Sequence, residues 1–272
     1  MTLLAIESAT DMVGVALIRD DGASAERVHE GGRAHAELLI PSVEEVCAAS
    51  GCTVADIDVI AVDVGPGLFT GLRGGVATAK ALGQALSVGL VGVSSLDILA
   101  AAARDRAGSR PDPGAPTVVS VVDARRGEVF AAAYPFAAVG FAEADDDDAA
   151  TVVVDPAAVR HDRPEPLTPV DLEAWLMELA SVHGRVTVVG DGAVRYHPQL
   201  VVHTELDLED AVALSSPPPL TLARLALARL ARGEVPTPAG DLVPDYRRPA
   251  DARINWEQRA PRSPTTGEAR PR

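Results

Sequence analysis

Residues 64–75 read VGPGLFTGLRGG, a run with five glycines and one proline. It follows an apolar strand pattern at residues 57–63 and precedes small residues at 76–86 that are typical of a helix. So many glycines predict a tight turn between strand and helix. Thr70 is the predicted N-cap of that helix. The free backbone N–H groups of such a terminus bind either an anion or another protein's backbone, and the residues alone leave both open.

The run lacks the signatures of two common phosphate-binding loops. A Walker loop ends in Lys followed by Ser or Thr, and no such pair closes this run. The G-x-G-x-x-G spacing of a Rossmann fingerprint is also missing. Arg73 contacts an anion or pairs with a carboxylate, and the second role is the commoner one for a lone arginine.

The helix after the run has unusually small side chains. Such residues let a second helix approach closely, which favours a docking surface beside the preceding helix, predicted at residues 34–49. Tight packing within the protein's own sheet layer explains them equally well. The small residues are Gly71, Gly74, Gly75, Ala77, Ala79, Ala81, Gly83 and Ala85.

Composition narrows the class of protein. The chain has 272 residues, 47% of them hydrophobic but only 3% aromatic, so its core is built from small aliphatic side chains. A net charge of −15 disfavours a free-standing nucleic-acid binder, which needs clustered Lys and Arg. No basic leader and no long apolar run is visible, so we expect neither a signal peptide nor a membrane span, and a cytoplasmic protein.

The order of predicted elements indicates a duplicated α/β protein. Two strands are predicted at residues 3–6 and 13–18, separated by an acidic turn. The same layout recurs in strands at 118–122 and 128–134. Alternating strands and helices with a hairpin at the start of each half imply mixed sheets. We therefore expect one lobe at residues 1–108, with a helix at about 220–232 packing back on it, and a second lobe at 109–215. Residues 250–272 are predicted to be a disordered tail.

Acidic turns in both halves form the candidate nucleotide site. Glu7 and Asp123 would face each other across a pseudo-twofold axis and position a hydrated Mg²⁺ beside a phosphate. Gly190, Asp191 and Gly192 would let a ribose or base lie against the backbone. The opposing interpretation is that these acidic residues and glycines form ordinary turns, in which both residue types are common, and bind no nucleotide.

Histidine and cysteine spacing argues against a built-in metal. No two of the six histidines lie three or four residues apart, so none forms a ligand pair on one helical face. Cys47 and Cys52 are the only cysteines and are expected to be reduced thiols. A serine-nucleophile motif is absent, and the cysteines have no evident base partner.

Four motifs together resemble the TsaB (YeaZ) family. They are IESAT at residues 6–10, GPGLFTGLR at 65–73, DARRGEV at 123–129 and PDYRR at 244–248. The GPG-x-FTGLR run is highly specific, although Leu68 stands where the family usually has Ser, and the likeness is best over residues 1–135. The resemblance implies the two-lobed actin/sugar-kinase/Hsp70-like (ribonuclease H-like) fold, with Ser8 added to the residues of a vestigial nucleotide cleft.

The same resemblance implies a function. TsaB-like proteins are the non-catalytic partners of TsaD, which makes N6-threonylcarbamoyladenosine at position 37 of tRNA together with the ATPase TsaE. The resemblance also implies that the chain has no catalytic residue, metal or cofactor of its own, and that ATP or ADP binds only within the complex. It implies that tRNA is contacted only through the complex, and that the chain forms a homodimer when TsaD is absent. The implied docking residues are His35, Leu38, Leu39, Thr70, Gly71, Arg73, Gly74, Ala77 and Ala81.

Two rival functions stay open from the residues. One is an ATPase or phosphotransferase of the same fold, with Glu7 and Asp123 around Mg²⁺-nucleotide. The other is a metallopeptidase, which requires a bound metal. A tRNA-binding module conflicts with the net charge of −15.

Overall fold

The computed structural model describes residues 1–30, 35–107, 117–135, 156–163, 165–200 and 212–247. The predicted tail at 250–272 therefore lies outside the described residues, and the lobe boundaries stay a prediction. Within the described ranges, no helix is both long and apolar enough to cross a bilayer.

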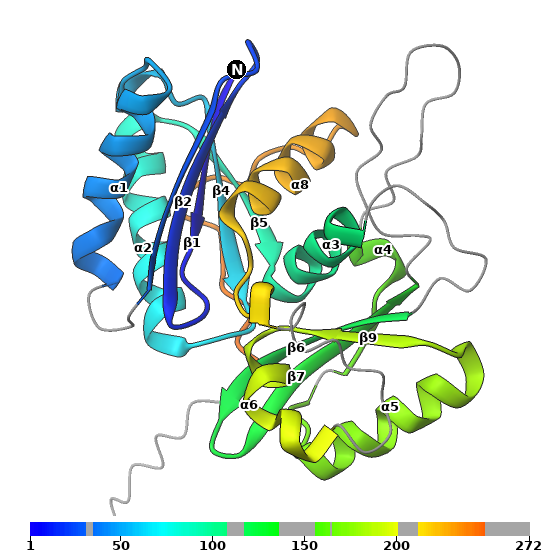
Figure 1. The fold of residues 1–272 in the computed structure, drawn as a ribbon. Coiled ribbons are helices and arrows are strands. Elements are labelled where there is room, and N and C mark those ends of the chain that lie inside the picture. The colour runs from blue at the N-terminus through cyan, green and yellow to red at the C-terminus, as the bar shows by residue number, and fades with distance from the viewer. Residues whose placement is uncertain (31–34, 108–116, 136–155, 164, 201–211, 248–272) are drawn as a thin grey trace, which may run out of the picture.

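The first lobe is built on a five-stranded mixed sheet in the order β3-β2-β1-β4-β5 (Figure 1). Strands β1 and β2 pair antiparallel, as do β2 and β3, whereas β1–β4 and β4–β5 are parallel. The strand bounds are β1 Thr2–Glu7, β2 Met12–Arg19, β3 Ser24–Glu30, β4 Val59–Gly65 and β5 Gly89–Ser94. A short 3-10 helix, η1, covers Val54–Asp56.

The second lobe repeats this arrangement on a smaller scale. Its four-stranded sheet has the order β8-β7-β6-β9, with antiparallel β6–β7 and β7–β8 pairs and a parallel β6–β9 pair. The strand bounds are β6 Thr117–Arg125, β7 Glu128–Pro135, β8 His161–Asp162 and β9 Val186–Val189. Because three strands, a helix, a parallel strand and a helix follow in the same order in both lobes, the duplicated α/β fold is confirmed.

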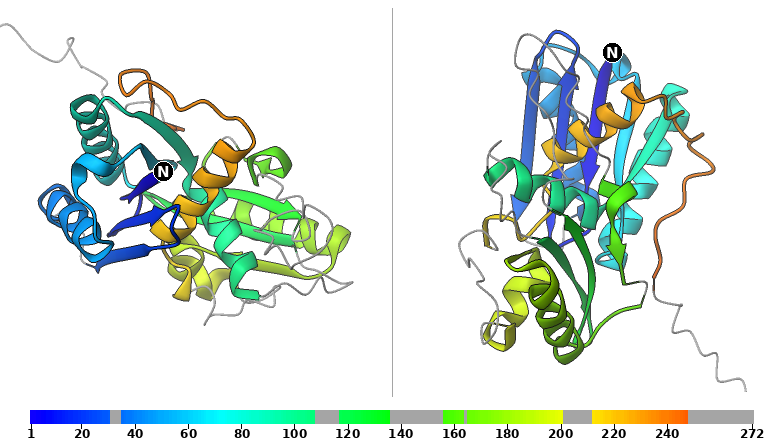
Figure 2. Two further views of the ribbon diagram at one scale, coloured as in Figure 1. Left: turned by 90° about the horizontal axis from the view of Figure 1, so that it is seen from above. Right: turned by 90° about the vertical axis from the view of Figure 1, so that its right-hand side faces the viewer.

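The helices separate and cover the two sheets, which gives five layers (Figures 1 and 2). Helices α1 and α2 lie on the outer face of the first sheet, α3 and α8 lie between the sheets, and α5 and α6 cover the second sheet. The helix bounds are α1 His35–Ala49, α2 Phe69–Leu86, α3 Ser95–Ala107, α4 Pro156–Val159, α5 Pro169–His183, α6 Asp191–Leu200 and α8 Pro219–Ala231.

Alternating side chains bury both faces of the central strands. In β1, Leu3 and Ala5 pack into the cluster between the sheets, while Leu4 and Ile6 pack under α1 and α2. This period of two is the geometry of a strand, and aliphatic residues on both faces are typical of a sheet with helices on each side. Cys47 lies buried in the outer cluster, and both cysteines are free thiols, as predicted.

The glycine run corrects one prediction. Helix α2 begins at Phe69, ahead of the predicted N-cap, so the second half of the run is helical although its glycines indicate a turn. Thr70 is not the N-cap, because Leu68 occupies that position and provides no side-chain cap. A Cβ on Gly67 would lie 2.3 Å from Ala9 O, and one on Gly75 would lie 2.1 Å from Ser8 Oγ. The glycines thus let the start of α2 pack directly against the β1–β2 turn.

Two further elements differ from the predictions. Strand β3 was not predicted, because its sequence SAERVHE has no apolar run and most of its side chains are exposed. The sequence indicates turn residues at 190–192, but Asp191 and Gly192 begin α6, a helix that the sequence did not predict. Thr168 is the N-cap of α5, and its hydroxyl oxygen accepts a hydrogen bond from the Asp171 N–H.

Candidate functional site

Four carboxyl groups meet where the carboxyl ends of β1, β4 and β6 approach the start of α6. Glu7, Asp63 and Asp123 are 1%, 0% and 4% exposed. The negative charges of Asp63 and Asp191 both raise the pKa of Glu7, so residues of both lobes share one electrostatic environment. Glu7 thus lies near Asp191 of the other lobe, and Asp191 in turn accepts a hydrogen bond from the Asp123 N–H. Asp63 is the member that sequence reasoning missed.

Glu7 and Asp63 form a buried pair of carboxyl groups. Burial raises the pKa of Glu7 well above its usual range, and the charge of Asp63 raises it further. Burial also raises the pKa of Asp63, to about 7. The raised pKa values disfavour two neighbouring negative charges, so Glu7 is protonated at neutral pH.

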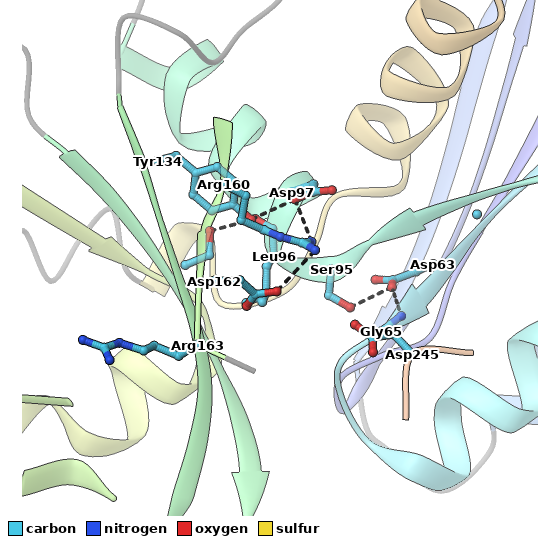
Figure 3. Close-up of polar contacts among 12 residues, drawn as sticks. Asp63, Gly65, Ser95, Leu96, Asp97, Tyr134, Arg160, Asp162, Arg163 and Asp245 are labelled. Carbon is cyan, nitrogen blue, oxygen red and sulfur yellow. Dashed lines mark hydrogen bonds and ion pairs between the residues drawn. The ribbon is translucent and has the colours of Figure 1, made fainter. Parts of the chain in front are cut away.

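The remaining contacts of the pair fix its position. Asp63 Oδ1 accepts hydrogen bonds from Ser95 Oγ and from the Gly65 N–H, each at 2.7 Å (Figure 3). Glu7 Oε1 accepts from the Ala9 N–H at 3.0 Å. These contacts hold one oxygen of each carboxyl group, whereas Asp63 Oδ2 is buried without a hydrogen-bond partner.

Asp123 is neutralised by arginines of its own lobe. Its Oδ2 lies 3.1 Å from Arg195 Nη1 and 3.3 Å from Arg125 Nη1, and its Oδ1 accepts from the Arg125 N–H at 2.9 Å. Arg125 also reaches Asp11 in the β1–β2 turn at 2.8 Å and so joins the turns of the two lobes. These guanidinium groups compensate the charge that a magnesium ion would need from Asp123.

Asp191 and its flanking glycines are packed against β6. The Asp191 Oδ1 accepts a hydrogen bond from the Asp123 N–H at 2.8 Å, while burial raises the pKa of the Asp191 carboxyl to about 6. A Cβ on Gly190 would lie 2.2 Å from Val121 O, and one on Gly192 would lie 2.8 Å from Val121 Cγ1. The space expected to receive a ribose or base is therefore filled by Val121.

Ser8 is also engaged within the protein. It is buried, and its Oγ donates a hydrogen bond to Gly71 O at 2.9 Å, which ties the β1–β2 turn to the first turn of α2. Among the described residues, no group of three or more His, Cys, Asp or Glu side chains is arranged to hold a metal ion.

The predicted docking residues divide into exposed and buried sets. Leu39 belongs to the hydrophobic core and Gly71 is buried, so neither presents its own surface. Leu38 is half-buried on α1, and His35 is the first residue of that helix. The rest lie along one side of α2, which we call the α2 face: Thr70, Arg73, Gly74, Ala77 and Ala81.

The α2 face ends in an aromatic cluster that the sequence did not predict. The Arg73 guanidinium lies 3.8 Å from the ring centroid of Phe69 and donates to the Tyr246 hydroxyl at 3.3 Å. Phe69 and Tyr246 are 46% and 43% exposed, with ring centroids 5.5 Å apart. Arg73 thus contacts two aromatic rings in this cluster. The PDYRR motif was the only signal for Tyr246.

The two mixed sheets, with helices between them and on their outer faces, define a duplicated α/β protein. The family model of TsaD, tRNA N6-adenosine threonylcarbamoyltransferase, matches residues 27–256. The chain belongs to this family, and within it the sequence motifs are those of its TsaB (YeaZ) members, as predicted.

Individual relatives agree with this assignment. An uncharacterized protein of Mycobacterium tuberculosis is 41% identical over 138 residues, which are 49% of this chain and 59% of that protein. The tRNA threonylcarbamoyladenosine biosynthesis protein TsaB of Escherichia coli is 35% identical over 134 residues, 49% of this chain and 55% of TsaB. The chain thus spans less than two thirds of the length of these curated relatives.

A solved structure matches over a longer range. It is an uncharacterized Pseudomonas aeruginosa protein described as similar to peptidase YEAZ. The TM-score is 0.68 at 27% identity, and the match covers 91% of this chain and 99% of that one.

Proposed function

We propose that the chain is the non-catalytic partner of a TsaD-like threonylcarbamoyltransferase in forming N6-threonylcarbamoyladenosine at position 37 of tRNA. The observation that supports the proposal concerns the carboxyl groups of Glu7, Asp63, Asp123 and Asp191, which lie where the two lobes meet. Each carboxyl group accepts a hydrogen bond from the chain or pairs with an arginine, and the pKa of Glu7 is raised well above its usual range. Although Asp63 Oδ2 has no partner, these groups together are a poor ligand set for Mg²⁺-nucleotide. The TsaB and TsaD relationships supply the pathway.

The α2 face is the proposed docking surface. Its exposed alanines and Gly74 leave the helix backbone accessible, and a Cβ on Gly74 would meet no atom within 4 Å. A partner helix can therefore approach α2 closely along this face. Leu38 and His35 on α1, which packs beside α2, would border the contact. The same face would support a homodimer in the absence of the catalytic subunit.

The proposal places the chemistry outside this chain. Threonylcarbamoyl transfer would take place on the TsaD-like subunit, and ATP hydrolysis on a TsaE-like ATPase. The chain would act by binding the active state of its partner more tightly than the inactive state. It would have no resident cofactor, contact tRNA only through the complex and work in the cytoplasm.

Co-purification with the TsaD-like subunit of the same organism tests the proposal. Ala81→Asp places a charge in the middle of the α2 face and is expected to abolish the complex while the isolated chain stays folded. Val182→Asp on α5 is the matched control, because Val182 is 69% exposed and belongs to the other lobe. An intact complex with Ala81→Asp would exclude this docking surface.

Two measurements on the isolated chain address the rival functions. Titration with ATP and Mg²⁺ that showed micromolar binding with turnover would favour the phosphotransferase. Elemental analysis that found stoichiometric metal would favour the metallopeptidase. The proposal predicts neither result.

A further inference from the structure

The segment after α8 runs along the first lobe and ends against the second (Figure 2). Thr237 forms an antiparallel bridge with Leu90 on the edge strand β5, with two backbone hydrogen bonds of 2.8 Å. Leu242 is buried in the cluster beneath α1 and α2. The Asp245 N–H then donates to Val64 O at 2.7 Å. Residues 237–247, which we call the strap, are thus built into the first lobe over most of their length.

Helix α2 holds the strap through two side chains. Lys80 Nζ donates to Gly240 O at 2.9 Å and to Leu242 O at 3.0 Å. Arg73, at one end of the α2 face, makes a second contact with the strap by donating a hydrogen bond to the Tyr246 hydroxyl. The strap and α2 are therefore positioned by each other.

The last described residue of the strap is anchored in the second lobe. Arg247 pairs with both carboxylate oxygens of Asp162 in β8, with Nη2 to Oδ2 at 2.8 Å. Its Nη1 also donates to Arg163 O at 3.3 Å, and its Nε donates to Asp245 Oδ2 at 2.8 Å. The Arg247 side chain is only 6% exposed, so this bidentate pair is largely shielded from water.

The anchor continues into the contacts between the lobes. Asp162 also lies 3.3 Å from Arg160 Nη2, and Arg160 Nη1 lies 3.2 Å from Asp97 in α3 (Figure 3). Asp97 in turn pairs with Arg229 of α8 at 3.3 Å. A line of alternating charges therefore runs from the strap through the edge of the second sheet to the helices between the sheets.

We propose that the strap couples the two lobes, so that loosening it at either lobe loosens its contacts at the other. The reason is geometric. The Lys80 side chain in the first lobe holds the middle of the strap at Gly240 and Leu242, and Asp162 in the second lobe holds its end at Arg247. The strap's own backbone joins these two points. Coupling of this kind is reciprocal, because both anchors bias the same attached state of the strap. The inference concerns the isolated chain and does not rest on the proposed docking function.

Amide hydrogen exchange of the isolated chain tests the coupling from both ends. Arg247→Lys keeps the charge but loses the two-pronged pairing with Asp162. It is expected to speed exchange of the Asp245 amide about tenfold, and that of the Thr237 amide to a smaller extent. Lys80→Gln cannot hold both strap carbonyls, and it is expected to speed exchange of the Arg163 amide, which is bonded to Ala131 O in the second sheet.

Arg224→Gln is the matched control. Its side chain is 51% exposed on α8 and pairs with Asp105 away from the strap, so exchange at all three amides is expected to stay unchanged. If Arg247→Lys prevents folding, Asp162→Asn removes the same anchor from the other side. The coupling is overturned if Lys80→Gln leaves the Arg163 amide unchanged, or if loss of the Arg247 anchor leaves the Asp245 amide unchanged.

Discussion

Glu7 at the end of β1 and Asp63 near the end of the neighbouring parallel strand β4 form a buried carboxyl pair, in which burial and the charge of Asp63 raise the pKa of Glu7. Burial raises the pKa of Asp63 as well, to about 7. In many nucleotide-dependent enzymes, paired carboxylates hold a cation, which requires both groups to be ionised. Here the raised pKa values disfavour the doubly ionised pair, which fits a scaffold better than a phosphotransferase.

The pair predicts a pH dependence of stability with a definite sign. For an acid whose pKa is raised on folding, the native state binds more protons than the unfolded state, so stability falls as pH rises between the two pKa values. Unfolded carboxyls titrate near pH 4, and Asp63 titrates at about 7 in the fold. The free energy of unfolding is therefore expected to decrease from pH 5 to pH 7.

Glu7→Gln isolates the contribution of Glu7 to that slope. Glutamine keeps an acceptor for the Ala9 N–H and a donor for Asp63 but does not titrate. Between pH 5 and 7, the slope is expected to become shallower by about 1.4 kcal/mol per pH unit, the value for one proton. Urea denaturation at several pH values measures it. An unchanged slope would mean that Glu7 is ionised in the native protein.

Two adjacent glycines of α2 are predicted to respond oppositely to alanine. Gly75→Ala forces a Cβ to within 2.1 Å of Ser8 Oγ and is expected to destabilise the protein by about 1–3 kcal/mol. Gly74→Ala meets open space and should stabilise by about 0.5–1 kcal/mol, because alanine favours the helix and restricts the unfolded chain. Equal effects in urea denaturation would contradict the close packing of α2 on the β1–β2 turn.

The buried Asp97 cluster is predicted to matter more than exposed ion pairs. Tyr134 donates to Asp97 Oδ1 at 2.8 Å, and both residues are buried. Tyr134→Phe removes a hydrogen bond to a charged acceptor and is expected to cost about 1.5–3 kcal/mol. Arg224→Ala, which breaks an exposed pair, is expected to cost less than about 1 kcal/mol. Thermal and urea denaturation of both variants compare these costs, and a reversed order would contradict the assignment.

Sequence pattern predicted the parts of the fold that depend on local periodicity. The apolar runs of β1, β2, β6 and β7 carry short-range signals that the structure confirms. Strand β3 has no such signal, since it forms by pairing with β2 along seven residues. The glycines of α2 indicate a turn by composition. Only the tertiary contact with Ser8 and Ala9 explains why they lie in a helix.

The candidate site was predictable only in part, for a related reason. Glu7 and Asp123 were recognisable because they occupy equivalent turns in the two repeats. Asp63 looked like one polar residue in a strand, and nothing in the sequence indicates that its carboxyl meets that of Glu7. Arg195, which neutralises Asp123, lies 72 residues away in a helix that was not predicted. Such long-range pairs depend on topology rather than on local pattern.

The most direct test of the central claim is reconstitution of the modification from purified components. The TsaD-like subunit, the TsaE-like ATPase, threonylcarbamoyl-adenylate and unmodified tRNA are incubated with and without this chain, and modified adenosine is quantified. We expect modification only when the chain and the TsaD-like subunit are both present, and loss of modification with Ala81→Asp. Modification of tRNA or turnover of ATP by this chain alone would contradict the account.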